Sequence, residues 1–362
     1  MVTIEQETRS SNASGDDEFA LRVEDLKVYY GTPRGTVKAV DGVSFNLKQG
    51  ERFALVGESG SGKSTLAMAI MRLTREPGHI AGGHIYLNGR DVVDMPEKEI
   101  RSIRLREMAL VPQGAMNSLN PVMRVGDQII DGIMDHVLPG ESPPNKSEID
   151  ERIHDLLIRV GLDPNVARLH PHELSGGMKQ RVAMAIAISL DPNIIVADEP
   201  TSALDVVVQR QIMQTLGRLQ EGLEAAVLLV GHDMGLVAQF ADTIGVMYAG
   251  KLVEVGSVPD VFKDPKHPYT QLLIESLPSF DISRQFVGIP GMQPALLNLP
   301  PGCSFNPRCP SVHERCFREV PAFLPIDGRG VACHLYDETV IPAQTPVIPA
   351  KAGIQRDEEV TN

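Results

Sequence analysis

The first 302 residues of this 362-residue chain contain no cysteine, and all four cysteines lie between Cys303 and Cys333. Long apolar runs are also missing. The longest, such as "AAVLLV" (residues 225–230), suit a buried strand and fall far short of the roughly 20 residues of a membrane-spanning helix. Positive charge is scarce, since 34 Lys and Arg against 47 Asp and Glu leave a net charge of −13. These absences argue against a membrane-spanning helix and against bulk binding to nucleic acid or anionic lipid.

The N-terminal segment, "MVTIEQETRSSNASGDDE", is polar and acidic and lacks the apolar core of a secretory signal. We therefore expect a cytosolic protein, in which thiols stay reduced and stable disulfides do not form. Residues 1–18 and 337–362 are predicted to be disordered, because neither segment has a helical or strand period that could build a core. The overall composition, 42% hydrophobic and 22% charged, is typical of a soluble globular protein.

Short strand-like segments come first along the chain, at residues 20–30, 42–47, 52–57 and 82–92. The last of them is predicted to be a hairpin element that turns at Asn88-Gly89. From about residue 97 to 170 the apolar spacing becomes helical. Two later runs, "IIVA" and "AAVLLV", are apolar on both faces and flank a helix-like stretch from Val206 to Leu223. This alternation predicts an α/β fold with a parallel sheet that helices cover on both sides.

A glycine-rich segment, "GESGSGKST", follows a predicted strand and precedes the helical "LAMAIMRL". It matches the pattern G-x-x-x-x-G-K-[ST] in the strand–loop–helix context that such a motif requires. Glycines let the backbone wrap phosphates, so that amide N–H groups and the helix N-terminus face the negative charge. Lys63 is expected to reach the β- and γ-phosphates of a nucleotide, and Ser64 to offer its hydroxyl oxygen to Mg²⁺. The expected nucleotide-binding residues of this loop are Gly57, Ser59, Gly60, Gly62, Lys63, Ser64 and Thr65.

Four further motifs follow this loop in the order "LVPQ", "HELSGGMKQR", "NIIVADEPTSALD" and "VLLVGHDM". In turn they supply Gln113, the signature Leu174–Gly177, Asp198-Glu199 at a strand end, and His232 at another strand end. With this set in this order, the chain from about Phe19 to Asp264 resembles the ATP-binding cassette (ABC) ATPases. The L-S-G-G signature is the specific part of the resemblance, because other phosphate-loop NTPases lack it.

The resemblance implies a RecA-like phosphate-loop NTPase core, an antiparallel β subdomain and a helical subdomain at about residues 97–170. ATP hydrolysis requires neutralisation by Mg²⁺, a positioned water and stabilisation of charge on the γ-phosphate. By resemblance, Asp198 holds Mg²⁺ and Glu199 is the base that polarises the attacking water. Gln113 joins the shell of the metal and the water, and His232 contacts the γ-phosphate.

Further roles concern adenine and a partner subunit. Tyr30, just before Gly31, matches the aromatic residue that stacks on adenine in this family, although a tyrosine in a strand can equally face the core. Ser175 and Gly177 lie at a helix N-terminus, which attracts anions, and in this family they complete the nucleotide site of a partner. The active unit is then two cassettes arranged head to tail around two ATP molecules. Asp205, in "TSALD", lines the same interface.

Two regions narrow the resemblance to the ATPases of oligopeptide and dipeptide importers. "QGAMNSLNPVMRVGDQI" is similar to the segment that receives a membrane subunit, although Gly114-Ala115 stand where the family usually has Asp-Pro. "KHPYTQLLIESLP" and "PPGCSFNPRCPSVHERC" match the small C-terminal extension of these subunits, expected here at residues 265–336. The resemblance thus spans about Phe19 to Leu335, with the ABC ATPase domain at 19–264.

Such a subunit is expected at the cytoplasmic face of the cell membrane. The implied partners are a second ABC ATPase subunit (a copy or a paralogue), two transmembrane permeases and an extracytoplasmic solute-binding protein, with no nucleic acid. The alternatives are a cassette ATPase of nucleic-acid repair or translation, or an importer of nickel, glutathione, haem precursors or sugars. Only 112 positions separate Lys63 from Ser175, with no heptad run, whereas a repair ATPase carries long insertions there. A translation-associated protein carries two cassettes in one chain, whereas this sequence has one set of the cassette motifs.

The cysteines Cys303, Cys309, Cys316 and Cys333 are separated by 5, 6 and 16 residues in a Pro- and Gly-rich segment. Scattered core thiols would not need to cluster in this way, so a four-thiolate metal site is predicted. Zinc sites favour paired cysteines two to four residues apart, whereas iron–sulfur clusters accept wider spacing. The resemblance implies a 4Fe-4S cluster, with zinc as the alternative. Its expected role is structural or regulatory, pinning an extension that is poor in apolar residues.

Overall fold

The computed structural model describes residues 18–114, 118–138, 140–277 and 288–339. The segments predicted to be disordered, residues 1–18 and 337–362, lie outside the described residues except for Glu18 and residues 337–339, and Ala115 also lies outside them. Residues 337–339 belong to a 3₁₀ helix, η6 (His334–Thr339). Regular structure therefore continues slightly past the predicted end of the extension.

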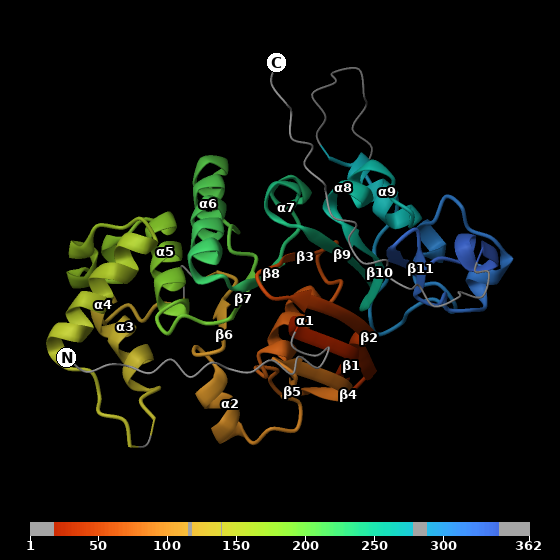
Figure 1. The fold of residues 1–362 in the computed structure, drawn as a ribbon. Helices are drawn as coiled ribbons and strands as arrows, with labels where there is room; N and C mark the ends of the chain where they lie inside the picture. Colours follow the sequence, from red (N-terminus) through yellow and green to blue (C-terminus); the bar gives the residue numbers. More distant parts are fainter. Residues whose placement is uncertain (1–17, 115–117, 139, 278–287, 340–362) are drawn as a thin grey trace, which may run out of the picture.

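The centre of the molecule is a sheet of eight strands, five of which are parallel (Figure 1). The parallel strands lie in the order β6 (Met108–Val111), β7 (Ile194–Asp198), β8 (Ala226–Val230), β3 (Arg52–Val56) and β9 (Thr243–Tyr248). Nearly all of their residues are buried, as the uninterrupted apolar runs predict. The predicted α/β fold class with a parallel sheet is confirmed.

This sheet separates two apolar cores, because successive side chains of a strand point to opposite faces. Phe53 and Leu55 of β3 enter a core shared with helix α1 (Lys63–Ile70) and a second, antiparallel sheet. Ala54 and Val56 enter the other core, which contains the helices on the opposite side. The end of β3 therefore lies between the core shared with the antiparallel sheet and the core that contains the helices.

The second sheet is antiparallel and matches the predicted β subdomain. Its strands lie in the order β2 (Gly35–Lys48), β1 (Phe19–Thr32), β4 (Gly78–Leu87) and β5 (Arg90–Asp91). The connection from β4 to β5 turns at Asn88 and Gly89, whose φ angles are 47° and 77°. Positive φ at both positions is the requirement of a tight hairpin turn, so this prediction is confirmed.

Helices α3, α4 and α5 gather in a helical part at one side of the molecule, next to α6 (Figure 1). The helices are α2 (Glu97–Ile103), α3 (Val125–Met134), α4 (Lys146–Arg159), α5 (Gly176–Ala187), α6 (Val206–Leu223) and α7 (Met234–Phe240), with 3₁₀ helices η2 (Pro164–Arg168) and η3 (Pro171–Glu173). The predicted helix at 206–223 is confirmed. The helical stretch predicted from 97 to 170 needs a correction, because β6 interrupts it. Its four residues are too few for a periodicity, and pairing with β7 decides their state.

The C-terminal region is built into the main sheet. Strand β10 (Lys251–Ser257) pairs with β9, β12 (Arg329–Val331) pairs with β10, and β11 (Leu324–Ile326) completes the edge. The other elements are α8 (Val258–Lys263), α9 (Pro268–Glu275), η4 (Asn306–Arg308) and η5 (Glu314–Phe317). A buried ion pair, Arg329 Nη1 to Glu254 Oε1 at 3.8 Å, joins β12 to β10. Within the described ranges, no helix is both long and apolar enough to span a bilayer.

Candidate functional site

The glycine-rich loop runs from the end of β3 to the start of α1, as predicted. Gly57, Gly60 and Gly62 have φ angles of 146°, 82° and 103°, a region that side-chain-bearing residues rarely adopt. A Cβ at position 57 would lie 2.2 Å from the carbonyl oxygen of Met247, and one at position 62 would lie 2.1 Å from that of Ala39. Glycine is therefore required at both positions by conformation and by space.

Lys63 lies under this loop and is almost fully buried. Its Nζ donates hydrogen bonds to the carbonyl oxygens of Gly57 (2.8 Å) and Glu58 (2.9 Å). Burial is the main influence on the Lys63 pKa and lowers it, while the charges of Glu199 and Asp198 act in the opposite direction. An ammonium group held in this position places a full positive charge beneath the backbone that would surround a phosphate.

The carboxylate of Asp198 closes the inner end of the site at the last residue of β7. Ser64 Oγ donates a hydrogen bond to Asp198 Oδ1 at 3.0 Å. Asp198 Oδ2 is buried and has no hydrogen-bond partner among the described residues. Burial is the largest cause that raises the Asp198 pKa, and the adjacent charge of Glu199 raises it further. A buried carboxylate oxygen without a donor, beside a hydroxyl oxygen, suits a hard divalent cation such as Mg²⁺.

Glu199 follows directly and has a φ of 45°, an unusual conformation for a residue with a side chain. Its N–H is held by the carbonyl oxygen of Val230 at 2.8 Å. Gln113 Nε2 donates to Glu199 Oε2 at 2.9 Å, and His232 Nδ1 lies 3.6 Å from Glu199 Oε1. The predicted trio of Gln113, Glu199 and His232 is therefore brought together at the ends of β6, β7 and β8.

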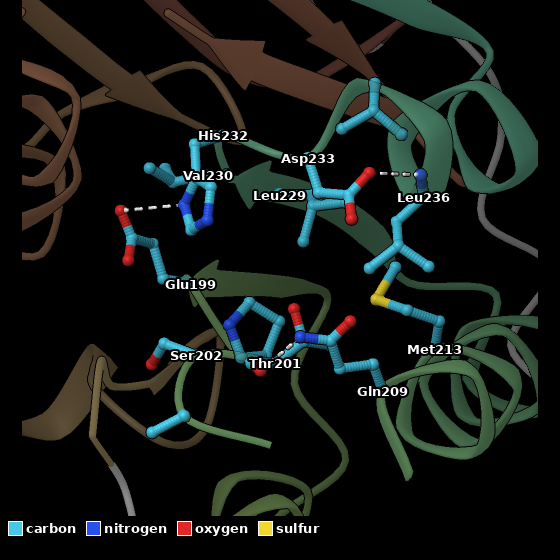
Figure 2. Close-up of a pocket in the computed structure, with 14 residues that line it drawn as sticks. Glu199, Thr201, Ser202, Gln209, Met213, Leu229, Val230, His232, Asp233 and Leu236 are labelled. Carbon is cyan, nitrogen blue, oxygen red and sulfur yellow. Dashed lines mark hydrogen bonds and ion pairs between the residues drawn. The ribbon is translucent and has the colours of Figure 1, made fainter. Parts of the chain in front are cut away.

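A pocket of about 130 Å³ lies beside Glu199 and His232 (Figure 2). In this view His232 points toward Glu199 across the ends of β7 and β8, and Asp233 turns away to cap α7. The imidazole of His232 is largely exposed, whereas the Glu199 carboxylate is mostly covered. The pocket therefore gives water access to a carboxylate that the protein holds in one orientation.

The other predicted loop residues are less buried than Lys63. Ser59 and Gly60 are exposed at the tip of the loop, and Thr65 lies half-buried in the first turn of α1.

Tyr30 lies on β1 opposite Gly78, where a Cβ at position 78 would come within 2.5 Å of the tyrosine ring. The ring is partly buried against the apolar core, so the core-facing alternative describes part of its surface and the rest is open.

The signature residues are not brought to this chain's own phosphate loop. Ser175 caps α5, and its Oγ accepts a hydrogen bond from the Met178 N–H at 3.3 Å. Gly177 packs so closely against α6 that a Cβ would lie 2.7 Å from Val208 Cγ1. Helix α5 stands in the helical part of the molecule, separated from α1 in the view of Figure 1. Asp205 caps α6 by accepting a hydrogen bond from Val208 N–H.

Three residues of the site were missed from the sequence. Glu58 is the one acidic residue of the glycine-rich loop, and both its backbone and its carboxylate contact the C-terminal region, through Tyr269 and Arg308. The available signal was the charge of Glu58 itself. An acidic side chain in this loop favours a nearby cation that neutralises it, but the sequence does not say which cation lies there.

The four cysteines share one neighbourhood of the extension. All four are free thiols; Cys316 is buried and the others are partly covered. Cys303 N–H donates to the Cys316 carbonyl oxygen at 2.9 Å. The pKa of Cys303 is raised to about 11 and that of Cys333 to about 12, mainly by burial and in part by neighbouring thiols. Even so, across the ranges that the structure covers, no group of three or more His, Cys, Asp or Glu residues is arranged to hold a metal ion.

Both parts of the chain match known family models. Residues 40–202 match the family model described as ABC transporter. Residues 253–316, from β10 to Cys316, match the model described as oligopeptide/dipeptide transporter, C-terminal region. The second match begins inside the main sheet, in agreement with the way the extension is joined to it.

Curated relatives cover most of the chain. The dipeptide transport ATP-binding protein DppD of Caldanaerobacter subterraneus subsp. tengcongensis is 43% identical over 321 residues, 88% of this chain and 97% of that protein. The oligopeptide transport ATP-binding protein OppD of Salmonella typhimurium is 43% identical over 316 residues, 86% of this chain and 92% of that protein. A solved structure, the dimeric post-hydrolysis state of the ATP-binding cassette MJ0796 bound to ADP and Pi, is 28% identical with a TM-score of 0.59. It covers 66% of this chain and 98% of its own.

Proposed function

The chain belongs to the ATP-binding subunits of the dipeptide and oligopeptide ABC transporters, and we propose that it hydrolyses ATP to drive peptide import. One observation carries the chemistry. Gln113 and His232 converge on the Glu199 carboxylate, directly beside the buried Asp198 whose free oxygen faces no donor in the described chain. Metal-holding and water-activating carboxylates are thus adjacent, as phosphoryl transfer to water requires.

Binding of the nucleotide falls to the loop and the residues around it. The N–H groups of residues 57–65 surround the phosphates, and the Lys63 ammonium group supplies the charge beneath them. Asp198 and Ser64 would hold Mg²⁺, with Gln113 nearby, and the ion would neutralise the phosphate charge. The open side of the Tyr30 ring is the stacking surface for adenine.

Glu199 is the general base in this proposal. Its carboxylate orients the attacking water and takes up a proton as the water oxygen bonds to the γ-phosphorus. The bond from the γ-phosphorus to the bridging oxygen breaks, and ADP and phosphate are the products. Gln113 Nε2 fixes one carboxylate oxygen and leaves the other to the water. His232, beside that second oxygen, donates to the γ-phosphate.

Two cassettes are needed for a complete site. Ser175 and Gly177 sit at the N-terminus of α5, away from the phosphate loop of the same chain, and supply N–H groups to the nucleotide on a second cassette. Asp205 lies at that interface. The second cassette is another copy of this chain or a paralogue. The dimeric structures of the solved relative MJ0796 support this arrangement.

Residues 19–264 form the ATPase domain and 265–336 the extension of a subunit at the cytoplasmic face of the membrane. This subunit powers transport through two transmembrane permeases, to which an extracytoplasmic solute-binding protein delivers the solute. The support for peptides as cargo is the C-terminal family match and the dipeptide and oligopeptide transport names of the curated relatives.

The decisive variant is Glu199→Gln, which keeps the shape of the side chain but removes its basicity. Turnover of ATP should fall about 100-fold or more, while ATP binding measured by calorimetry stays within about twofold. Glu151→Gln, on the exposed face of α4, is the matched control and should leave turnover unchanged. Near-normal turnover by Glu199→Gln would remove this residue from the base role.

We also propose that the four cysteines bind a 4Fe-4S cluster, with one zinc ion as the alternative. The support is the chemistry of the donors: four free thiols, of which Cys303, Cys309 and Cys316 lie close enough to Cys333 to raise its pKa. Anaerobically purified protein should contain about four irons per chain. Colourless protein with one zinc supports the alternative, and Cys309→Ser should lose the metal but retain ATP binding.

A further inference from the structure

Glu58, the second residue of the phosphate loop, contacts three other residues, and two of these belong to the C-terminal region. Glu58 N–H donates to Tyr269 Oη at 2.9 Å. Its carboxylate forms a two-pronged ion pair with Arg308, whose Nη1 and Nη2 lie 2.7 and 3.0 Å from the two carboxylate oxygens. Its carbonyl oxygen accepts the hydrogen bond from Lys63. The backbone and side chain of Glu58 are thus both fixed in place.

Arg308 is itself rigidly placed. Its side chain is only 4% exposed, and its Nε donates to the Pro290 carbonyl oxygen at 2.8 Å. The guanidinium carbon lies 5.9 Å from the centre of the Tyr248 ring, which packs against Tyr269 at 4.6 Å. Phe305 packs against both tyrosines. The cation that reaches the phosphate loop is therefore mounted on an aromatic cluster that joins β9, α9 and η4.

We propose that Arg308 and Tyr269 are positioning residues of the ATP site, acting through Glu58, so that the C-terminal extension sets the affinity of the phosphate loop for ATP. The inference rests on the proposed function, because it takes residues 57–65 as the phosphate-binding loop. Neither residue touches the phosphates. Each acts on the loop residue whose carbonyl oxygen contacts the Lys63 ammonium group.

The physical reason has an electrostatic part and a geometric part. An unpaired carboxylate in this loop would repel the polyphosphate and compete with it for Lys63, and the bidentate guanidinium of Arg308 neutralises it. The hydrogen bond to Tyr269 fixes the direction of the Glu58 peptide, and so of the loop that follows it. Loop geometry that is set before ATP arrives costs no ordering entropy when ATP binds.

The test is a double-mutant cycle in the full chain, with ATP and Mg²⁺ titrated by calorimetry in a Glu199→Gln background so that hydrolysis is suppressed. Arg308→Met should weaken ATP binding about tenfold. In the Glu58→Gln background, where no carboxylate needs neutralising, the same substitution should change affinity less than about twofold. Arg308→Lys keeps the charge without the fork and should fall between. Arg318→Met, an exposed arginine of the same extension, is the matched control and should bind normally.

Equal losses from Arg308→Met in both backgrounds would overturn the inference, because they would show that Arg308 supports the fold and does not act through Glu58. Normal binding by Arg308→Met would also overturn it. If Arg308→Met does not fold, Tyr269→Phe gives an independent test, since it keeps the ring and removes only the acceptor of the Glu58 N–H; about threefold weaker binding is expected and unchanged binding contradicts the proposal. Failure of the parent protein to bind ATP would instead refute the proposed function.

Discussion

At the scale of single residues, the site contains groups that cost stability when no ligand compensates them. Asp198 keeps a carboxylate oxygen buried without a donor in the described structure, and Glu199 adopts a left-handed backbone conformation. Strain and unpaired polar atoms of this kind persist where the surrounding structure enforces them, and they are concentrated at functional sites. Here the enforcement comes from β7, which is buried along its whole length, and from the Glu199 N–H bond to Val230.

Asp198→Asn should therefore stabilise the ligand-free protein while it removes hydrolysis. Burial holds the pKa of Asp198 above its ordinary value of 3.8, so the folded chain keeps a proton at pH values where the unfolded chain has lost it. The stability due to this group is greatest below pH 3.8 and falls as the pH rises through the folded-state pKa. At neutral pH the variant should gain about 1–3 kcal/mol in the free energy of unfolding, measured with urea. Asp150→Asn, exposed on α4, is the control. A less stable variant would contradict this account of Asp198.

At the scale of elements, the strand–loop–helix unit works because the sheet and its neighbours leave no room around the loop. The backbones of β9 and β2 approach Gly57 and Gly62 so closely that a methyl group at either position would overlap a carbonyl oxygen. Gly60 also has a positive φ but faces open space. A glycine in this loop can therefore be required for its positive φ, for the space around its Cα atom, or for both, and the structure shows which applies at each position.

Comparison of Gly62→Ala with Gly60→Ala should separate them in experiment. Gly60→Ala pays only for the left-handed backbone, about 1–2 kcal/mol, and should keep most of its ATP affinity. Gly62→Ala must in addition displace the backbone at Ala39, so its ATP affinity should fall at least about tenfold, with a larger drop in melting temperature. Thermal melts and ATP titrations provide the two measurements. Equal effects at both positions would show that clearance around Gly62 is unimportant.

At the scale of the whole molecule, the residues proposed for hydrolysis and the L-S-G-G signature lie in different parts of the chain. The signature lies on α5 in the helical part, whereas the phosphate loop lies between the two sheets. The C-terminal extension belongs to the catalytic half, because it extends the main sheet through β12 and reaches the loop through Arg308. In the proposed mechanism, nucleotide binding and completion of a partner's site therefore fall to different parts of one chain.

Ser175→Arg should separate these two halves. ATP binding to the single chain should stay within about twofold, because Ser175 is remote from the loop, while hydrolysis by the assembled complex should fall about 100-fold. Ser147→Arg, another exposed serine of the helical part, is the control and should hydrolyse ATP normally. If Ser175→Arg weakened binding to the isolated chain as much as it weakened hydrolysis, the signature would act on its own chain's nucleotide.

Local patterns were sufficient for much of the fold and the site. The glycine loop between a strand and a helix, the helix at 206–223 and the hairpin turn at Asn88-Gly89 depend on periodicity and backbone conformation within a few residues. The trio of Gln113, Glu199 and His232 was predicted from the resemblance to the ABC ATPases. The structure brings the three residues together because each follows a parallel strand that ends at the same edge of the sheet.

The sequence by itself thus determined the fold class, the phosphate loop and the hairpin turn, because each depends on a short stretch of chain. Only the tertiary structure decided the rest. The four residues of β6 became a strand by pairing with β7, across an interval of more than 80 residues. The contact of Arg308 with Glu58 joins positions 250 residues apart. No local pattern encodes which distant cation neutralises a given carboxylate, since that choice is made when the sheet folds and carries the extension to the loop.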